Sequence, residues 1–211
     1  MRLEEKHPLA IRWFHWLNFP LLFAMIYSGL AIYWAYQPYS LAGFHFFPRG
    51  FFESLGLRYR LGEGMGLHFF FMWLFALNGL AYVSYLAISG EWRELWPSRG
   101  SFKRALLEVG HSLRLVKEKP EQGKYNDAQR LAYCGVIVMG VGALLTGLAI
   151  YKPVQLGWLR WLLGGYQWAR AEHFALTMGF LAFFLVHVLQ VIRAGWNNFR
   201  AMVIGCEVVD E

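Results

Sequence analysis

Four of the seven histidines lie at positions where an ionisable side chain is unusual. His15, His68, His173 and His187 each fall within, or at the start of, a long stretch without a single charged residue. An imidazole can hydrogen-bond, transfer a proton or ligate a metal through a ring nitrogen. One such histidine would more often be a hydrogen-bonded packing residue. Four of them indicate a shared chemical role.

The stretches that carry these histidines have the length of membrane-spanning helices. Four of them contain no Lys, Arg, Asp or Glu: residues 13–48, 64–90, 131–151 and 173–192. A helix needs roughly 20 residues to cross a bilayer. The apolar residues run on continuously instead of alternating, which favours helices over barrel strands. We therefore predict an all-α integral membrane protein, a single domain over residues 1–211, with helices at roughly 13–36, 65–89, 129–151 and 172–193.

Composition excludes the other protein classes. Apolar residues make up 57% of the 211 residues and charged residues only 16%. A soluble domain carries about 25% charged residues, and a chain this apolar could not hide its surface in water. Disordered chains need a polar composition. Two cysteines cannot form a disulfide framework.

Basic residues predict the orientation in the membrane. The N-terminus, the 91–130 loop and the 193–211 tail together hold 14 Lys and Arg, against 6 in the two opposite loops. The positive-inside rule therefore places both termini on the cytoplasmic side. This distribution also accounts for the net charge of +6 without nucleic-acid binding.

The depths of the four histidines sort them into two pairs. Since successive helices run in opposite directions, His15 lies at the cytoplasmic end and His68 at the outer end. His173 also lies at the outer end, and His187 follows 14 residues later, about 21 Å deeper and on nearly the same helix face. The pairs are thus His68 with His173, and His15 with His187.

Paired imidazoles without other ligands favour haem. Zinc takes four protein ligands, or three with water, whereas haem iron needs only axial ligands from the protein. Helix bundles build such cofactor sites between facing helices. Several glycines in these helices would allow close approach, although small residues also serve plain helix packing: Gly29, Gly66, Gly140, Gly142, Gly147 and Gly179. We expect two stacked haems b.

Motifs along nearly the whole chain resemble a known family. They are RWFHW in the first helix, GLH in the second, GKYNDAQRLAY before the third, and two histidines 14 residues apart in the fourth. This order resembles the di-haem cytochrome b subunits of formate dehydrogenase, thiosulfate reductase and nickel–iron hydrogenase, which are prokaryotic cytochrome b561-like. The run GGYQWARAEHF and the ending RAGWNNFRAMVIGCEV look most like the thiosulfate-reductase type. The resemblance implies a multi-pass protein of the bacterial cytoplasmic (inner) membrane.

The resemblance also implies the ligands and a quinone site. His15 and His187 would ligate the cytoplasmic-side haem, and His68 and His173 the outer haem. A menaquinone or ubiquinone would bind near the inner haem, at residues that the family's lysine–tyrosine–asparagine segment provides: Lys124, Tyr125, Asn126 and Gln129.

The same segment has a structural alternative. Asn126 could cap the third helix, and Asp127, where relatives often carry a small uncharged residue, could complement the helix dipole.

Haem propionates need cationic partners. Arg12 and Arg170 each precede a predicted ligand by three residues, and Arg suits bidentate carboxylate pairing. Flanking arginines are also the ordinary topology signal, so both roles remain open. Likewise, the aromatic outer loops at 39–57 and 158–168 fit an interfacial aromatic belt or, alternatively, a docking surface for an extracytoplasmic partner.

The predicted function is electron transfer between the quinone pool and an extracytoplasmic oxidoreductase. The resemblance implies that this partner contains molybdopterin, with or without an iron–sulfur subunit. One alternative is a stand-alone cytochrome b561-type protein that oxidises superoxide and reduces quinone. Another is a haem-free membrane anchor or transporter.

Overall fold

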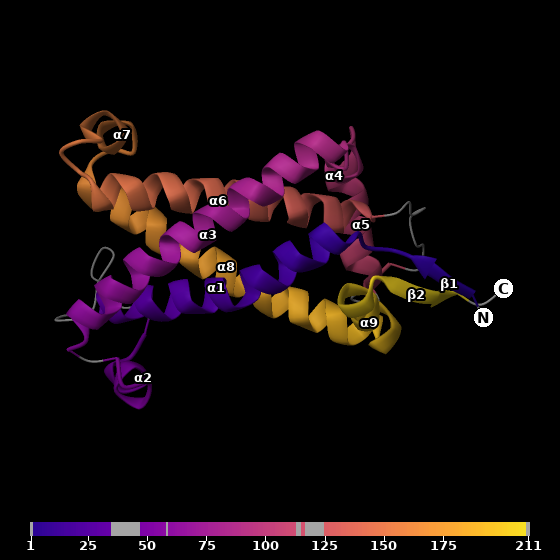
Figure 1. The fold of residues 1–211 in the computed structure, drawn as a ribbon, viewed down its shortest axis with the longest axis horizontal. Coiled ribbons are helices and arrows are strands. Elements are labelled where there is room, and N and C mark those ends of the chain that lie inside the picture. The colour runs from indigo at the N-terminus through magenta and orange to yellow at the C-terminus, as the bar shows by residue number, and fades with distance from the viewer. Residues whose placement is uncertain (1, 35–46, 58, 113–114, 117–124, 210–211) are drawn as a thin grey trace. The chain divides into compact units, whose positions relative to one another are not determined.

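The computed structural model describes residues 2–34, 47–57, 59–112, 115–116 and 125–209 (Figure 1). Its four long helices are α1 (Leu9–Tyr33), α3 (Leu61–Ser89), α6 (Asp127–Tyr151) and α8 (Tyr166–Ala194). Five shorter helices are α2 (Arg49–Ser54), α4 (Trp92–Leu95), α5 (Ser101–Ser112), α7 (Gly157–Leu162) and α9 (Trp196–Ile204). Two short strands are β1 (Arg2–Glu5) and β2 (Cys206–Val209).

The predicted fold class is confirmed. All four long helices have the length and apolar composition of membrane spans. Every one begins earlier than the charge-free stretches indicated, since a helix continues past the apolar region into its polar flanks; α8, for example, starts at Tyr166 rather than 172. The predicted end of the first helix, residues 35–36, lies outside the described residues. The paired strands were not predicted, because four residues are too short for a period-two pattern to show.

The chain divides into two compact units, residues 1–82 with 190–211 and residues 83–189. In the first unit, β1 and β2 pair antiparallel from Arg2 opposite Val209 to Glu5 opposite Cys206 (Figure 1). Lys6 Nζ contacts Glu207 Oε2 at 2.5 Å. The two ends of the described chain therefore lie together, which agrees with an even number of membrane crossings.

Within the first unit, α1 and α3 form an antiparallel pair. Contacts advance along α3 as they recede along α1: Gly64 lies at Ala31, His68 at Ser28, and Asn78 at Phe14. A Cβ at Gly64 would lie 3.0 Å from Ala31 Cβ and 3.2 Å from the Ser28 carbonyl oxygen. Glycine at this position therefore allows the two backbones to approach closely.

Within the second unit, α6 and α8 form a similar antiparallel pair. Thr146 contacts His173, Gly142 faces Leu176, and Met139 faces Gly179. The turn between the helices contains α7 and ends with Gly164 (φ 75°) and Gly165 (φ 108°). Positive φ favours glycine at these two positions.

Few apolar side chains of the spans are buried within the protein, and the rest are partly or fully exposed. Leu77 and Leu80 on α3, Val138 on α6 and Leu185 on α8 are all at least 60% exposed. In water such surface would be unstable, whereas lipid solvates it well. The exposure supports membrane insertion, with lipid as the solvent of the outward helix faces.

Candidate haem and quinone sites

On α3, His68 is held by a hydroxyl of α1. Ser28 Oγ lies 2.9 Å from His68 Nδ1 and 2.6 Å from the Ala24 carbonyl oxygen of its own helix. The Ser28 side chain is fully buried. A Cβ at the next residue, Gly29, would lie 3.4 Å from His68 Cε1. The imidazole therefore rests against a Ser–Gly pair.

On α8, His173 is held in the same way by α6. Thr146 Oγ1 lies 2.9 Å from His173 Nδ1 and 2.7 Å from the Gly142 carbonyl oxygen. Thr146 is 2% exposed. A Cβ at Gly147 would lie 3.2 Å from His173 Cε1. A Thr–Gly pair thus repeats the arrangement of the first unit.

These contacts assign the proton on both imidazoles. An oxygen–oxygen separation of 2.6 or 2.7 Å needs a shared proton, and a carbonyl has none to donate, so each hydroxyl donates to its own helix. Each hydroxyl oxygen then accepts the Nδ1–H of the histidine. The lone pair is left on Nε2, and an imidazole with this tautomer can ligate a metal through Nε2. His68 and His173 therefore fit axial haem ligation.

His15 lies on α1 between two residues that bind the C-terminal segment. Arg12 Nη1 donates to the Val203 carbonyl at 2.7 Å, and Trp16 Nε1 donates to the Met202 carbonyl at 3.0 Å. Cationic Arg12 thereby neutralises the carbonyl end of α9. Its Nε is buried without a hydrogen-bond partner, as is the Nε of Arg200 in the same unit. These donors suit a carboxylate, so the predicted propionate role of Arg12 fits the structure.

His187 lies on α8, and its ring stacks on that of Phe183 with centroids 5.7 Å apart. The helix is continuous from Tyr166 to Ala194, as the predicted spacing from His173 requires. Arg170, the other predicted propionate partner, contacts Gln167 Oε1 at 3.4 Å and lies 6.0 Å from the Tyr166 ring centroid. Arg170 thus has local partners at the start of the helix.

The predicted quinone segment begins α6. Lys124 lies outside the described residues. Asn126 Oδ1 accepts the Gln129 backbone N–H at 2.8 Å, and Gln129 Oε1 accepts the Asn126 backbone N–H at 3.0 Å. This is a capping box, so the capping alternative is confirmed. The cap uses both amide oxygens and leaves both NH₂ groups outside it. The ring of Tyr125 meets that of Tyr133 edge to face, 5.4 Å away.

Charged residues of α5 hold the same helix start. Asp127 accepts hydrogen bonds from Ser101 Oγ and, at 2.5 Å, from Arg104 Nε. The hydrogen bond to Asp127 raises the pKa of the Arg104 guanidinium. Glu108 Oε2 accepts the Ala128 backbone N–H at 2.9 Å. Donors therefore surround both carboxylates, which indicates that Asp127 and Glu108 hold the start of α6 in position.

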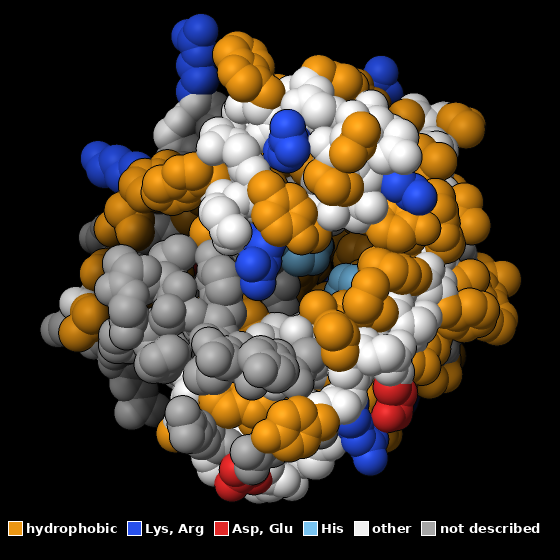
Figure 2. Space-filling view, turned by 90° about the vertical axis from the view of Figure 1, so that its left-hand side faces the viewer, with side chains coloured by type: hydrophobic (Ala, Val, Ile, Leu, Met, Phe, Trp, Pro, Cys, Tyr) orange, Lys and Arg blue, Asp and Glu red, His pale blue; other side chains and the backbone are white. Residues whose placement is uncertain are grey.

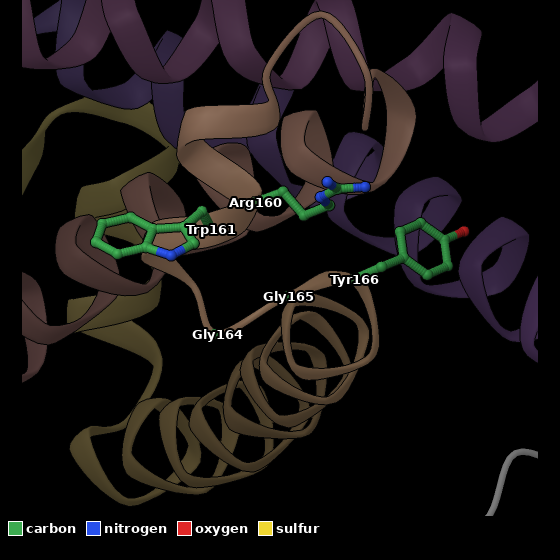
Figure 3. Close-up of a pocket in the computed structure, with 5 residues that line it drawn as sticks. All are labelled: Arg160, Trp161, Gly164, Gly165 and Tyr166. Carbon is green, nitrogen blue, oxygen red and sulfur yellow. The ribbon is translucent and has the colours of Figure 1, made fainter.

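The α7–α8 turn carries aromatic and basic side chains. Trp158 and Trp161 are 65% and 80% exposed. Hydrophobic and basic side chains gather at the top of Figure 2, at the level of α7 in Figure 1. An open cleft of about 340 Å³ lies beside Gly164 and Gly165; Arg160 extends toward the side where Tyr166 lies, and Trp161 extends in the opposite direction (Figure 3). Such a segment suits either predicted role, interfacial belt or docking surface.

Sequence reasoning missed the hydroxyls and the role of one glycine. Ser28 and Thr146 are ordinary residues in an apolar helix until their distance to a histidine is known. Of the glycines expected to allow close approach, Gly29 and Gly147 contact the histidines, whereas a Cβ at Gly66 or Gly140 would meet nothing within 4 Å. Gly64, where the backbones of α1 and α3 approach closely, was not among them.

One buried amide was missed as well. Asn78 on α3 is 7% exposed, and its NH₂ lies 3.3 Å from the Phe14 carbonyl and 3.5 Å from Asn18 Oδ1. The signal available in the sequence was an amide inside a charge-free stretch, because such groups need a partner in lipid.

Comparison with known proteins agrees with these features. Residues 6–205 match the family model described as prokaryotic cytochrome b561. The chain is 34% identical over 186 residues to an Azospira oryzae protein named "Putative protein-methionine-sulfoxide reductase subunit YedZ1", covering 88% of this chain and 89% of that protein. The predicted cytochrome b relationship is confirmed.

The match extends over nearly the whole chain and includes all four long helices, while β1 and β2 lie just outside it. The family implies haem b as the cofactor. The chain therefore belongs to the prokaryotic cytochrome b561 family and is a multi-pass electron-transfer protein of the bacterial cytoplasmic membrane.

Proposed function

We propose that this protein carries electrons across the membrane from quinol to an extracytoplasmic oxidoreductase, using two bis-histidine haems b. The observation that carries the proposal is the pair of hydroxyl–imidazole contacts, Ser28 to His68 and Thr146 to His173, at 2.9 Å each. With Nδ1–H donating to the hydroxyl, Nε2 carries the lone pair and is the atom that we propose binds iron in both histidines. Haem b supplies reversible one-electron transfer when bound between two imidazoles.

The ligand pairs follow from the depths of the histidines along the helices. His68 and His173 hold the outer haem, and His15 and His187 the cytoplasmic-side haem. Arg12 on α1 provides a guanidinium three residues before its ligand, with a buried Nε that lacks a hydrogen-bond partner. Arg170 occupies the corresponding place before His173. Both arginines are proposed to bind haem propionates.

The start of α6 is proposed as the quinone site. Because the capping box uses the oxygens of Asn126 and Gln129, their NH₂ groups are the donors that face a quinone carbonyl. Tyr125 and Lys124 complete the proposed set. Quinol oxidation releases two electrons and two protons, and the protons leave toward the cytoplasm.

The partner accepts electrons on the outer side. The relative from Azospira oryzae is named as a subunit of a protein-methionine-sulfoxide reductase, which supports a reductase as partner and an outward flow of electrons. On such a partner a sulfoxide, two electrons and two protons would give a thioether and water. We further propose, from the resemblance to thiosulfate-reductase-type proteins, that the partner contains molybdopterin, with or without an iron–sulfur subunit.

The proposal is tested with the purified protein in lipid nanodiscs. Menaquinol or ubiquinol should reduce haem b, seen as growth of the α-band absorbance, and reduction should be abolished in His15→Ala. Asn126→Asp replaces an NH₂ donor by a carboxylate and should slow reduction by quinol while dithionite reduction stays complete. Asn126→Ser also loses the NH₂ donor but retains a capping oxygen, so slower reduction by quinol in this variant reports the quinone contact and not the loss of the helix cap. Full reduction by quinol in His15→Ala would contradict the proposal.

Two alternatives give different results in the same preparation. A stand-alone superoxide oxidoreductase would be reduced rapidly by superoxide and would pass those electrons to quinone without any partner protein. A haem-free anchor or transporter would show no Soret absorbance. The proposed function predicts quinol-reducible haem and re-oxidation only when an extracytoplasmic oxidoreductase and its oxidised substrate are added.

A further inference from the structure

The same three-residue arrangement occurs in both units of the chain. In each, a buried hydroxyl bonds to the carbonyl four residues earlier on its own helix and to Nδ1 of a histidine on the antiparallel neighbour. In each, the residue after the hydroxyl is a glycine that lies against Cε1 of the same ring. The distances agree closely, with 2.9 Å to Nδ1 in both units and 2.6 and 2.7 Å to the carbonyls.

Helix packing alone does not account for this repetition. A serine or threonine within a spanning helix is already satisfied by the bond to its own backbone. In both helix pairs, however, a second polar group lies against the hydroxyl oxygen, and in both it is Nδ1 of a histidine. This arrangement needs the hydroxyl as acceptor and the adjacent glycine to leave room for the ring. Ser28 and Thr146 are 0% and 2% exposed, so no solvent competes for the remaining lone pair.

We propose that Ser28 and Thr146 are matched positioning residues that set the tautomer, the ring orientation and the electron donation of the two histidines of the outer haem. This inference rests on the proposed function. A hydrogen bond from Nδ1–H to the hydroxyl makes the imidazole a more basic ligand. A more basic ligand stabilises the ferric form, so the two hydroxyls lower the midpoint potential of the outer haem.

The predicted consequence is a set of potential shifts. In Ser28→Ala and in Thr146→Val the midpoint potential of the outer haem rises, and in the double variant it rises by about the sum, since the two hydroxyls act on two ligands of one iron. The cytoplasmic-side haem keeps its potential. His68→Ala identifies which component of the redox titration belongs to the outer haem.

The chain provides its own conservative controls. Because one unit uses serine and the other threonine for the same contact, Ser28→Thr and Thr146→Ser retain the hydroxyl and should keep the wild-type potential. Ser84→Ala removes an exposed hydroxyl from α3 and should change nothing. The experiment is a spectroelectrochemical titration of each purified variant in nanodiscs, with low-temperature electron paramagnetic resonance to report ring orientation.

The outcomes separate this inference from the proposed function. An upward shift confined to the outer haem, or selective loss of that haem, in the hydroxyl-free variants supports the inference. The inference would be overturned, and the proposed function left standing, by any of four results. These are unchanged potentials with both haems bound, equal shifts in both haems, loss of both haems, or a shift in Ser28→Thr as large as that in Ser28→Ala. A wild-type protein without two haem components would instead refute the proposed function.

Discussion

The α1/α3 and α6/α8 pairs share one contact and differ in how their predicted cytoplasmic ends are held. In both, a hydroxyl and a glycine hold a histidine. At the other end of α1, the cationic Arg12 and the neutral Trp16 donate hydrogen bonds to the last carbonyls of α9. The start of α6 is instead enclosed by the charged and polar side chains of α5.

This difference separates two kinds of residue. The contact that recurs involves a predicted ligand, and no requirement of local folding explains why both units should have it. The contacts that do not recur join the helix end to a neighbouring segment, which is α9 in the first unit and α5 in the second. We therefore expect substitutions at the shared contact to alter haem properties, and substitutions at the differing ends to alter stability.

The largest effect should come from filling the space beside the two histidines. Gly29→Leu and Gly147→Leu place a side chain where Cβ alone would lie 3.4 and 3.2 Å from the imidazole. Each variant should lose most of the outer haem while the other haem stays bound, measured by pyridine haemochrome. As matched controls, Gly66→Leu and Gly140→Leu should retain both haems, because a Cβ there meets nothing within 4 Å. Equal loss of haem in the two control variants would contradict a special role for the glycines beside the histidines.

A smaller effect, on stability alone, should come from the start of α6. Glu108→Ala removes a buried acceptor from the first turn of the helix, which should cost about 1–2 kcal/mol. The melting temperature should fall by roughly 2–4 °C per kcal/mol. The exposed Lys103→Ala on the same helix is the control. A changed haem potential in Glu108→Ala would show that this end also acts on the cofactor.

The corresponding end of α1 should respond less. Trp16→Phe loses the hydrogen bond to the Met202 carbonyl, worth about 0.5–1.5 kcal/mol. Hydrogen exchange in α9 should become faster while α8 keeps its protection. Trp13→Phe, which changes a side chain that is 68% exposed, is the matched control. Unchanged exchange in α9 would mean that other contacts suffice to hold it.

The smallest effect should come from the ion pair beside the paired strands. Lys6 and Glu207 are only partly buried, so Lys6→Met should change stability by about 0–1 kcal/mol. The difference from wild type should shrink further at high salt, because screening weakens exposed charge pairs. A large, salt-insensitive loss would show that the strands are essential to the fold.

Charge-free stretches in the sequence predict the four helices, because burial in lipid excludes charge over about 20 residues at a time. They also predict which histidines matter. They cannot predict partners such as Ser28 or Thr146, because a contact between helices depends on rotation about the helix axis, which apolar residues on every face leave undetermined. The sequence predicts two roles for Asn126, helix capping and quinone binding. The capping box could be foreseen as one of them because it depends only on residues close in sequence.

The short elements were harder to predict for a different reason. β1 and β2 pair through residues that are about two hundred positions apart, and neither has a pattern of its own. α5 is amphipathic, but its attachment depends on Ser101, Arg104 and Glu108 meeting a helix start that lies beyond the 113–124 segment. Long-range polar contacts of this kind become visible only in three dimensions.

Haem stoichiometry in the histidine variants tests the central claim most directly. The wild-type protein, quantified by pyridine haemochrome, should contain two haems b per chain. His68→Ala and His173→Ala should each remove one haem, with the same spectral and redox component lost in both, and His15→Ala and His187→Ala should each remove the other. Loss of the same component in His15→Ala and His68→Ala, or a wild-type protein with fewer than two haems, would contradict the account.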